Sequence, residues 1–279
     1  MKNVCIKDPD STNYDNKKLN LSILFTQNGL CFSIKSVDDN KCLVLYSTIF
    51  SSRRKSLAET ETFLKSENIV SKDYNSVSIV IVDPRQTIVP SALFSPGAEK
   101  KLWKLNFEPN VTDIICYSFL EKSDNYIIYP INKGLRTIID RFFPVNKTFP
   151  SSYSFIEKHF TRNKLFENQN NERMFIQIFE NYFEMLVLNK SGIRLFNVFQ
   201  YSTSNDILYY IISVFDRLKL IQTETEVIFS GFVESDDHLI INLKKFISQL
   251  GFESQSNEFN YFYRFQEIAP HYYYNFLNL

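Results

Sequence analysis

The sequence predicts an α/β fold with mixed sheets, built from two tandem units that share one order of elements. Three observations predict it: short apolar runs separated by turn residues, the pair Asn28 and Gly29 between two such runs, and amphipathic helical stretches after each group of runs. The chain has 279 residues, and domains average roughly 150. We therefore expect two domains of similar size, residues 1–145 and 146–279, with residues 1–18 as a loose lead-in.

The first unit begins as a three-stranded meander. Asn28 and Gly29 give the strongest short-range hairpin signal, and Asp38 to Asn40 supply the next turn. A continuous apolar run from Val77 to Val82 predicts a strand that is buried on both faces. The resulting order β-β-β-α-β-α-β comprises strands 19–26, 30–35 and 42–46, helix 51–67, strand 77–82, helix 91–105 and strand 111–119.

The same order is found again after a predicted hairpin at 126–129 and helices near 134–142 and 153–166. Thr203 precedes Asp206 by three residues, which is typical of a capping box at the start of a helix. The second unit comprises strands 174–179, 182–188 and 193–200, helix 203–219, strand 226–229, helix 237–250 and a last strand from Phe252. The aromatic tail at 271–277 is expected to dock onto its own domain; if exposed, it would be a partner-binding strip.

Charge and glycine content exclude several classes of function. Lysine plus arginine and aspartate plus glutamate both number 31, so the chain has no basic excess for binding nucleic acid. The short basic clusters at 53–55 and 100–101 predict solvated helix faces. The six glycines are widely separated, which disfavours a glycine-rich phosphate loop.

Cysteine and histidine spacing points away from metal and redox chemistry. The cysteines at 5, 31, 42 and 116 form no C-x-x-C motif, which indicates reduced, buried thiols. His159, His238 and His271 lack the spacing of metal ligands, so we expect no metal site. No run is long enough for a signal peptide core or a membrane helix, and we expect a cytoplasmic protein without a transmembrane segment.

Several segments carry a resemblance to a known family. In the second unit they are the strand 182–188, Gly192, the run 195–201, the helix start 206–210 and the run Phe229 to Gly231; in the first unit they are the hairpin 21–34 and the segment 88–94. Together they resemble a bacterial domain-of-unknown-function family, number 3822, from about residue 19 to the C-terminus. The resemblance implies the actin-like ATPase fold, made of two ribonuclease-H-like domains, and no established biochemical activity.

The resemblance also implies where a nucleotide would bind. Actin-like ATPases place an Asp-x-Gly at the first hairpin of each unit, where the Asp handles Mg²⁺ and water and the Gly lets backbone N–H groups approach phosphate. In the first unit the Asp position falls on Leu24 or Phe25. In the second unit Gln177 stands for the Asp and Phe179 for the Gly. The candidate nucleotide-binding residues are Gln27, Asn28 and Gly29 at the first hairpin, Gln177, and Ser230 and Gly231 at the purine side.

The function that we expect follows from these departures. Asp83 is explained as a turn residue ahead of Pro84, and Asp206 as a helix cap. We expect a non-catalytic protein of actin-like fold that acts through contacts with a protein partner and needs no cofactor. The alternative is a nucleotide-binding switch or weak ATPase that holds ATP and Mg²⁺ with the divergent residues. A weaker alternative, by analogy of fold alone, is a platform in pilus or secretion assembly.

Overall fold

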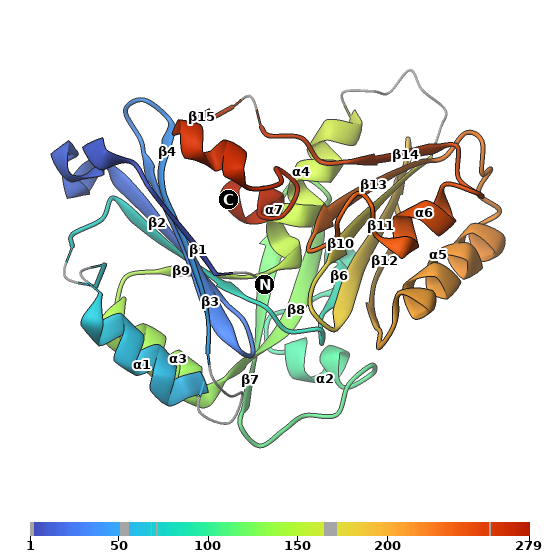
Figure 1. Cartoon of the computed structure of the whole chain (residues 1–279). Coiled ribbons are helices and arrows are strands. Elements are labelled where there is room, and N and C mark those ends of the chain that lie inside the picture. The colour runs from blue at the N-terminus through green and yellow to red at the C-terminus, as the bar shows by residue number, and fades with distance from the viewer. Residues whose placement is uncertain (1–2, 51–55, 68, 71, 165–171, 257) are drawn as a thin grey trace.

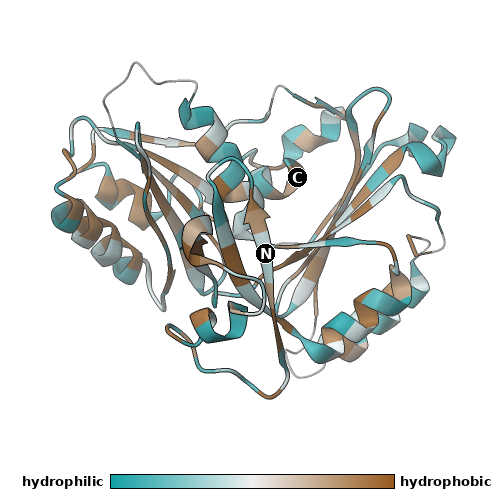
Figure 2. Ribbon diagram, turned by 180° about the vertical axis from the view of Figure 1, so that it is seen from behind, coloured by the Kyte–Doolittle hydropathy of each residue, from teal (hydrophilic) through white to brown (hydrophobic). Residues whose placement is uncertain are grey.

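Two large sheets face each other across the C-terminal segment, and a small third sheet lies between them (Figure 1). The computed structural model describes residues 3–50, 56–67, 69–70, 72–164, 172–256 and 258–279. Helices α1 (Ser56–Ser66) and α3 (Lys133–Phe142) cover the outer side of the first large sheet, while α5 (Ser204–Leu218) and α6 (His238–Leu243) cover the outer side of the second (Figure 1). Hydrophobic residues run along the strands of both large sheets (Figure 2). The expected α/β fold with mixed sheets is confirmed.

The first large sheet has at its centre the strand order β4-β3-β2-β5-β9. Antiparallel pairing joins β2, β3 and β4, and parallel pairing joins β2 to β5 and β5 to β9. The outer core contains Leu64 of α1 and Ile138 and Ile139 of α3. The elements are β2 (Leu19–Phe25), β3 (Gly29–Ser36), β4 (Lys41–Ile49), α1 (Ser56–Ser66), β5 (Ser76–Ile81), α3 (Lys133–Phe142) and β9 (Lys147–Pro150).

The second large sheet repeats this arrangement, with the order β12-β11-β10-β13-β14. In both sheets the first strand of the unit lies in the middle, flanked by the meander on one side and by parallel strands on the other. The capping box of Thr203 and Asp206 begins α5, as the sequence predicts. The elements are β10 (Arg173–Ile178), β11 (Tyr182–Asn189), β12 (Gly192–Gln200), α5 (Ser204–Leu218), β13 (Glu226–Gly231), α6 (His238–Leu243) and β14 (Gln249–Phe252). The prediction of duplicated β-β-β-α-β-α-β units is therefore confirmed.

One assignment within the first unit is wrong. The predicted helix 91–105 and strand 111–119 do not complete the first sheet; α3 and β9 do so. The intervening chain forms a separate sheet of order β6-β8-β7, because β7 pairs with the next strand along the chain through a short hairpin. Its elements are β6 (Thr87–Pro90), η4 (Ser91–Leu93), α2 (Glu99–Trp103), β7 (Asp113–Leu120) and β8 (Asn125–Asn132).

The N-terminal lead-in is more ordered than the sequence predicts. Strand β1 (Val4–Lys7) pairs with β4, and the short helices η1 (Pro9–Asn13) and η2 (Asn16–Lys18) follow it. Ile6 is buried, and Asp8 forms an ion pair with Lys41 at 2.6 Å. The predicted helix 237–250 is also too long, because α6 ends at Leu243 and β14 begins at Gln249.

The sequence predicts that the C-terminal segment docks onto its own domain. In the structure it contacts both halves. Strand β15 (Asn260–Tyr261) pairs with β4 of the first sheet. After η5 (Tyr263–Glu267), helix α7 (Tyr274–Leu277) lies between the two large sheets, where Phe276 and Leu277 join a core with residues of both halves. The boundary between residues 145 and 146 stays a prediction, although β9 and β15 come after it and lie in the first sheet.

Candidate functional site

The first hairpin presents a polar tip to the cleft between the halves. The turn is closed by the Thr26 N–H, which donates to the Gly29 carbonyl at 3.0 Å. Gln27 is exposed and Asn28 is half-buried. The Asn28 Nδ2 donates to Glu180 Oε2 at 2.8 Å, so the tips of the two hairpins touch each other. Of the predicted residues Gln27, Asn28 and Gly29, only Asn28 makes a side-chain hydrogen bond to the other half.

The second hairpin is closed in the same way but carries aromatic side chains. The Phe179 N–H donates to the Tyr182 carbonyl at 2.9 Å, and the two rings stack with centroids 4.7 Å apart. Both residues are buried, in the same core as Phe276 of the C-terminal segment. The cavity between the two tips measures about 30 Å³, which is room for a water molecule or two. Phe179 therefore fills space at the position where the resemblance implies a glycine.

Gln177 and Ser230 lie side by side on the cleft face of the second sheet, and the chain's own Asn275 binds both. They are register partners in the parallel strands β10 and β13. The Asn275 Nδ2 donates to Gln177 Oε1 at 2.6 Å and to Ser230 Oγ at 3.0 Å. All three side chains are buried. Two of the predicted nucleotide-binding residues are thus occupied by an amide from the C-terminal segment.

Gly231 has a structural role of its own at the end of β13. Its φ is +83°, and a Cβ added there would lie 2.1 Å from the Ile178 carbonyl oxygen. Only glycine fits this backbone position without rearrangement. Its N–H donates to the His271 carbonyl at 2.8 Å, so this donor too is taken by the C-terminal segment.

A buried lysine of the first sheet anchors the end of the segment. Lys35 Nζ donates to the backbone oxygens of Leu277, at 3.0 Å, and Leu279, at 2.9 Å. Leu277 is the last residue of α7, so a cation here meets the negative end of a short helix. Burial lowers the pKa of Lys35, and the charge of nearby Lys158 lowers it further.

Sequence reasoning missed Asn275 and a buried carboxyl on β11. Glu184 is fully buried, and its Oε1 accepts from Ser151 Oγ at 2.6 Å and from Gln86 Nε2 at 3.2 Å. Burial raises the pKa of Glu184 to about 8, against an ordinary value of 4.5, so the group is largely neutral at neutral pH. Glutamate in the middle of an apolar strand run was the available signal, because a central strand rarely holds an acid without a partner.

The remaining sequence candidates have structural roles. Asp83 Oδ1 accepts from the Arg85 N–H at 2.8 Å, and Arg85 also pairs with Asp113 at 2.6 Å. His159 is buried and stacks on Phe175 with centroids 4.1 Å apart. Burial and the nearby Arg162 and Lys158 hold the pKa of His159 well below its ordinary value, so the ring is neutral. In the part of the chain that the structure describes, no three His, Cys, Asp or Glu side chains are grouped to hold a metal ion.

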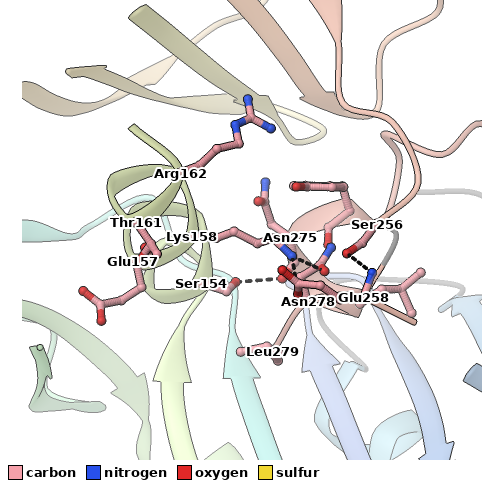
Figure 3. A network of polar contacts seen from close by, with 12 residues as sticks. Ser154, Glu157, Lys158, Thr161, Arg162, Ser256, Glu258, Asn275, Asn278 and Leu279 are labelled. Atoms are coloured by element: carbon pink, nitrogen blue, oxygen red, sulfur yellow. Dashed lines mark hydrogen bonds and ion pairs between the residues drawn. The ribbon is translucent and has the colours of Figure 1, made fainter. Parts of the chain in front are cut away.

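A larger groove lies between α4 (Ser152–Lys164) and the C-terminal residues, with a volume of about 730 Å³ (Figure 3). Two of its basic side chains are ion-paired: Lys158 with Glu258 at 3.2 Å, and Arg162 with Glu253 at 2.8 Å. The Ser154 hydroxyl donates to the Asn275 carbonyl at 2.8 Å, which ties α4 to the C-terminal segment. None of the predicted nucleotide-binding residues lines this groove. A smaller recess of about 380 Å³ beside the first hairpin is lined in part by Gln27 and Asp83.

Comparison with solved structures shows the fold. A protein with actin-like ATPase fold and unknown function from Bacteroides thetaiotaomicron VPI-5482 superposes with a TM-score of 0.79 at 24% identity, over 85% of this chain and 91% of that one. A PilM–PilN type IV pilus biogenesis complex gives a TM-score of 0.57 at 12% identity, over 93% of this chain and 97% of that one. No protein among curated sequences matches. The chain therefore has the actin-like ATPase fold.

Comparison with sequence families identifies the relatives. The family described as "Protein of unknown function (DUF3822)" matches residues 8–250, so the match ends before the segment that fills the cleft. None of the helices in the described part of the chain is long and apolar enough to cross a membrane. Both the matched length and the shared fold agree with the resemblance in the sequence, and the chain belongs to the DUF3822 family of proteins of unknown function.

Proposed function

We propose that this protein is a non-catalytic member of the actin-like fold that acts through contacts with a protein partner. The observation that carries the proposal is the C-terminal segment in the cleft. Asn275 uses its amide on Gln177 and Ser230, and the His271 carbonyl takes the N–H of Gly231. A nucleotide would have to displace this segment from a core that it shares with both halves.

The chemistry of the cleft supports the same proposal. Nucleotide hydrolysis needs an acid to handle Mg²⁺ and its water, because the metal neutralises phosphate charge and prefers oxygen ligands. The corresponding positions carry Leu24, in an apolar core, and Gln177, whose carboxamide cannot neutralise a metal ion. Glu184 is close by in the sheet, but its raised pKa of about 8 keeps it largely neutral. The cleft therefore offers packing and hydrogen bonds in place of metal-binding charge.

Two alternatives remain distinct proposals. A nucleotide-binding switch would use Gln27, Asn28 and Gly29 on the first hairpin, after the C-terminal segment has left Gln177 and Ser230. A platform role in assembly is suggested by the likeness to the PilM–PilN complex, which is described as a type IV pilus biogenesis complex. That likeness is one of fold, and it agrees with a role through protein contacts.

A thermal-shift series with ATP, ADP and MgCl₂ tests the proposal. A ligand at 100 times its Kd stabilises the folded state by about 2.7 kcal/mol, which raises the melting temperature of a chain of this size by roughly 5 °C or more. We expect no such shift with Mg-ATP or Mg-ADP beyond a matched series of MgCl₂ and inorganic phosphate. A saturable nucleotide-dependent shift, or ATP hydrolysis that Gln177→Ala abolishes, would overturn the proposal in favour of the switch.

A further inference from the structure

Strand β7 is a long, free edge of the third sheet. It hydrogen-bonds to β8 alone among the described strands. Seven of its eight residues keep contact with solvent, whereas Ile127 to Ile131 of the neighbouring β8 are buried. A free edge presents a row of backbone donors and acceptors to any extended chain that approaches.

The register shows which groups of β7 point outward. The Lys133 N–H donates to the Thr112 carbonyl at 2.8 Å, and this pair continues the β7–β8 ladder by one step. Hydrogen-bonded pairs in an antiparallel ladder alternate, so the even-numbered residues of β7 bond to β8. The backbone groups of Ile115, Tyr117 and Phe119 therefore face the free edge. Pro130, opposite Ile115, fits this phase, because a proline has no N–H to donate.

The edge of β7 lacks the usual protection against strand addition. Proteins guard free edges with lysine, proline, bulges or short strands. Strand β12 has a bulge against β11 and carries Arg194; β1 has four residues and ends in Lys7; β9 has four residues and ends in Pro150. Strand β7 has eight residues in unbroken register, with no lysine or proline.

An aromatic patch adjoins this edge. Tyr117 and Phe119 are 41% and 40% exposed and lie on one face of the sheet. The Tyr126 ring stacks on Phe94 with centroids 4.0 Å apart and lies 4.9 Å from Phe119. Leu93, on the preceding turn, is 71% exposed. Clustered, exposed aromatic side chains of this kind are typical of protein interfaces.

Helix α2 and the residue after it carry three lysines against one glutamate, Glu99, so the charge beside the patch is net positive. Helix α2 packs on β7 and exposes Lys100 and Lys101, and Lys104 follows at its end. None of these three has a carboxylate within ion-pairing distance among the residues that the structure describes. A second copy paired edge to edge would bring its own α2 lysines to the same face. Like charges disfavour that occupant, and an acidic partner matches the surface.

We propose that the β7 edge and the Phe94–Tyr117–Phe119–Tyr126 patch dock an extended segment of a partner protein, which adds as a further strand of the third sheet. The segment would alternate apolar with polar residues, so that its apolar side chains meet Tyr117 and Phe119, and would carry acidic residues beside α2. Backbone pairing supplies affinity, and the aromatic and lysine contacts supply specificity. The inference rests on the proposed function, because it names the surface through which the protein would contact its partner.

The test uses the full chain and a fluorescent peptide with the core Thr-Val-Thr-Phe-Thr-Val, flanked at both ends by glutamates. Fluorescence anisotropy is measured without nucleotide. We expect saturable binding, about tenfold weaker when lysines replace the flanking glutamates. Tyr117→Pro removes a backbone N–H donor at the free edge but leaves the hydrogen bonds to β8 intact. Phe119→Lys places at this edge a lysine, which disfavours the addition of a further strand. Each should weaken binding at least about tenfold, whereas Tyr209→Lys, at a 68% exposed tyrosine on α5, should not.

Charge is tested by Lys100→Glu with Lys101→Glu and Lys104→Glu, against Lys244→Glu with Lys245→Glu on the far half as the control. The first set should reverse the preference for the acidic peptide, and the second should leave it unchanged. Absence of saturable binding, or equal binding by wild type, Phe119→Lys and Tyr117→Pro, overturns the inference. A dimer that Phe119→Lys converts to monomer without any peptide binding would identify a second copy as the occupant and overturn it too. Nucleotide is absent throughout, so a nucleotide-dependent thermal shift would count against the proposed function and leave the peptide result intact.

Discussion

The cleft faces of the two large sheets differ in chemistry although their backbones correspond. In the first sheet Leu24 lies on the central strand between its register partners Cys31 and Val80. In the second sheet the same three positions hold Gln177, Glu184 and Ser230. At these three positions the first unit is apolar and the second is polar.

The C-terminal segment matches both faces. Tyr273, Phe276 and Leu277 share a core with Leu24 and its neighbours, while Asn275 bonds to Gln177 and Ser230. The C-terminal segment therefore places apolar side chains in a core shared by both halves and an amide against the second sheet. The two units therefore share one strand order, while their cleft side chains differ and together hold a piece of the chain itself.

The largest loss of stability is expected from Gly231→Ala at the cleft end of β13. The new Cβ would lie 2.1 Å from the Ile178 carbonyl oxygen, at a φ of +83°, so the strand pair must move apart. We expect a loss of about 5 kcal/mol in the free energy of unfolding, or no folded protein. Gly251→Ala is the matched control, since nothing lies within 4 Å of its Cβ, and it should change stability by less than about 0.5 kcal/mol. Urea denaturation measures both; similar stabilities would contradict the assigned role of Gly231.

The apolar contacts of the C-terminal segment are tested by Phe276→Ala. Phe276 is 5% exposed in the core that joins both halves, and removal of a buried phenylalanine ring costs about 3–5 kcal/mol. Phe246→Ala, at a residue that is 49% exposed, should cost about 1 kcal/mol or less. Equal losses for the two variants, measured by urea denaturation, would mean that the segment does not fill the cleft in solution.

The buried carboxyl of Glu184 on the second sheet makes the free energy of unfolding depend on pH. The pKa of Glu184 is raised to about 8 by burial, whereas the unfolded chain has the ordinary value of 4.5. The folded state therefore holds a proton that the unfolded state has released. The stability from this group is fully present below pH 4.5 and is lost progressively as the pH rises to about 8. Between pH 6 and 8 the loss is about 2 kcal/mol.

Glu184→Gln isolates this contribution, because it keeps the shape and cannot ionise. We expect its urea midpoint to fall less than that of the wild type between pH 6 and 8. The two proteins are compared at each pH, so that titration of other groups cancels. Parallel curves for the two proteins would contradict the raised pKa of Glu184.

Local signals predicted most of the fold and little of the cleft. Strand runs, the Asn28–Gly29 turn and the Thr203–Asp206 capping box act over a few residues, so both units could be read in order. Partner choice is not local. The sequence could not show that β9 rather than β7 completes the first sheet, since β7 is an eight-residue apolar run, whereas β9 has four residues and only one of them, Phe149, is a large apolar residue. Asn275 and Gln177 are 98 residues apart, and only the folded chain brings their amides together.

The smallest effect concerns how far Asn275 and Ser230 act together. Asn275→Ala removes the donor and leaves Gln177 Oε1 and Ser230 Oγ buried with one partner fewer. Ser230→Ala removes one of the two acceptors. Because the two side chains share one hydrogen bond, the double variant should be less destabilised than the sum of the single ones, by about 1 kcal/mol. Asn275→Ala combined with Tyr209→Ala, on the outer helix α5, should be additive within about 0.5 kcal/mol. Additivity in both cycles would show that Asn275 is held by packing alone, and that the polar face of the second sheet does not select the residue opposite it.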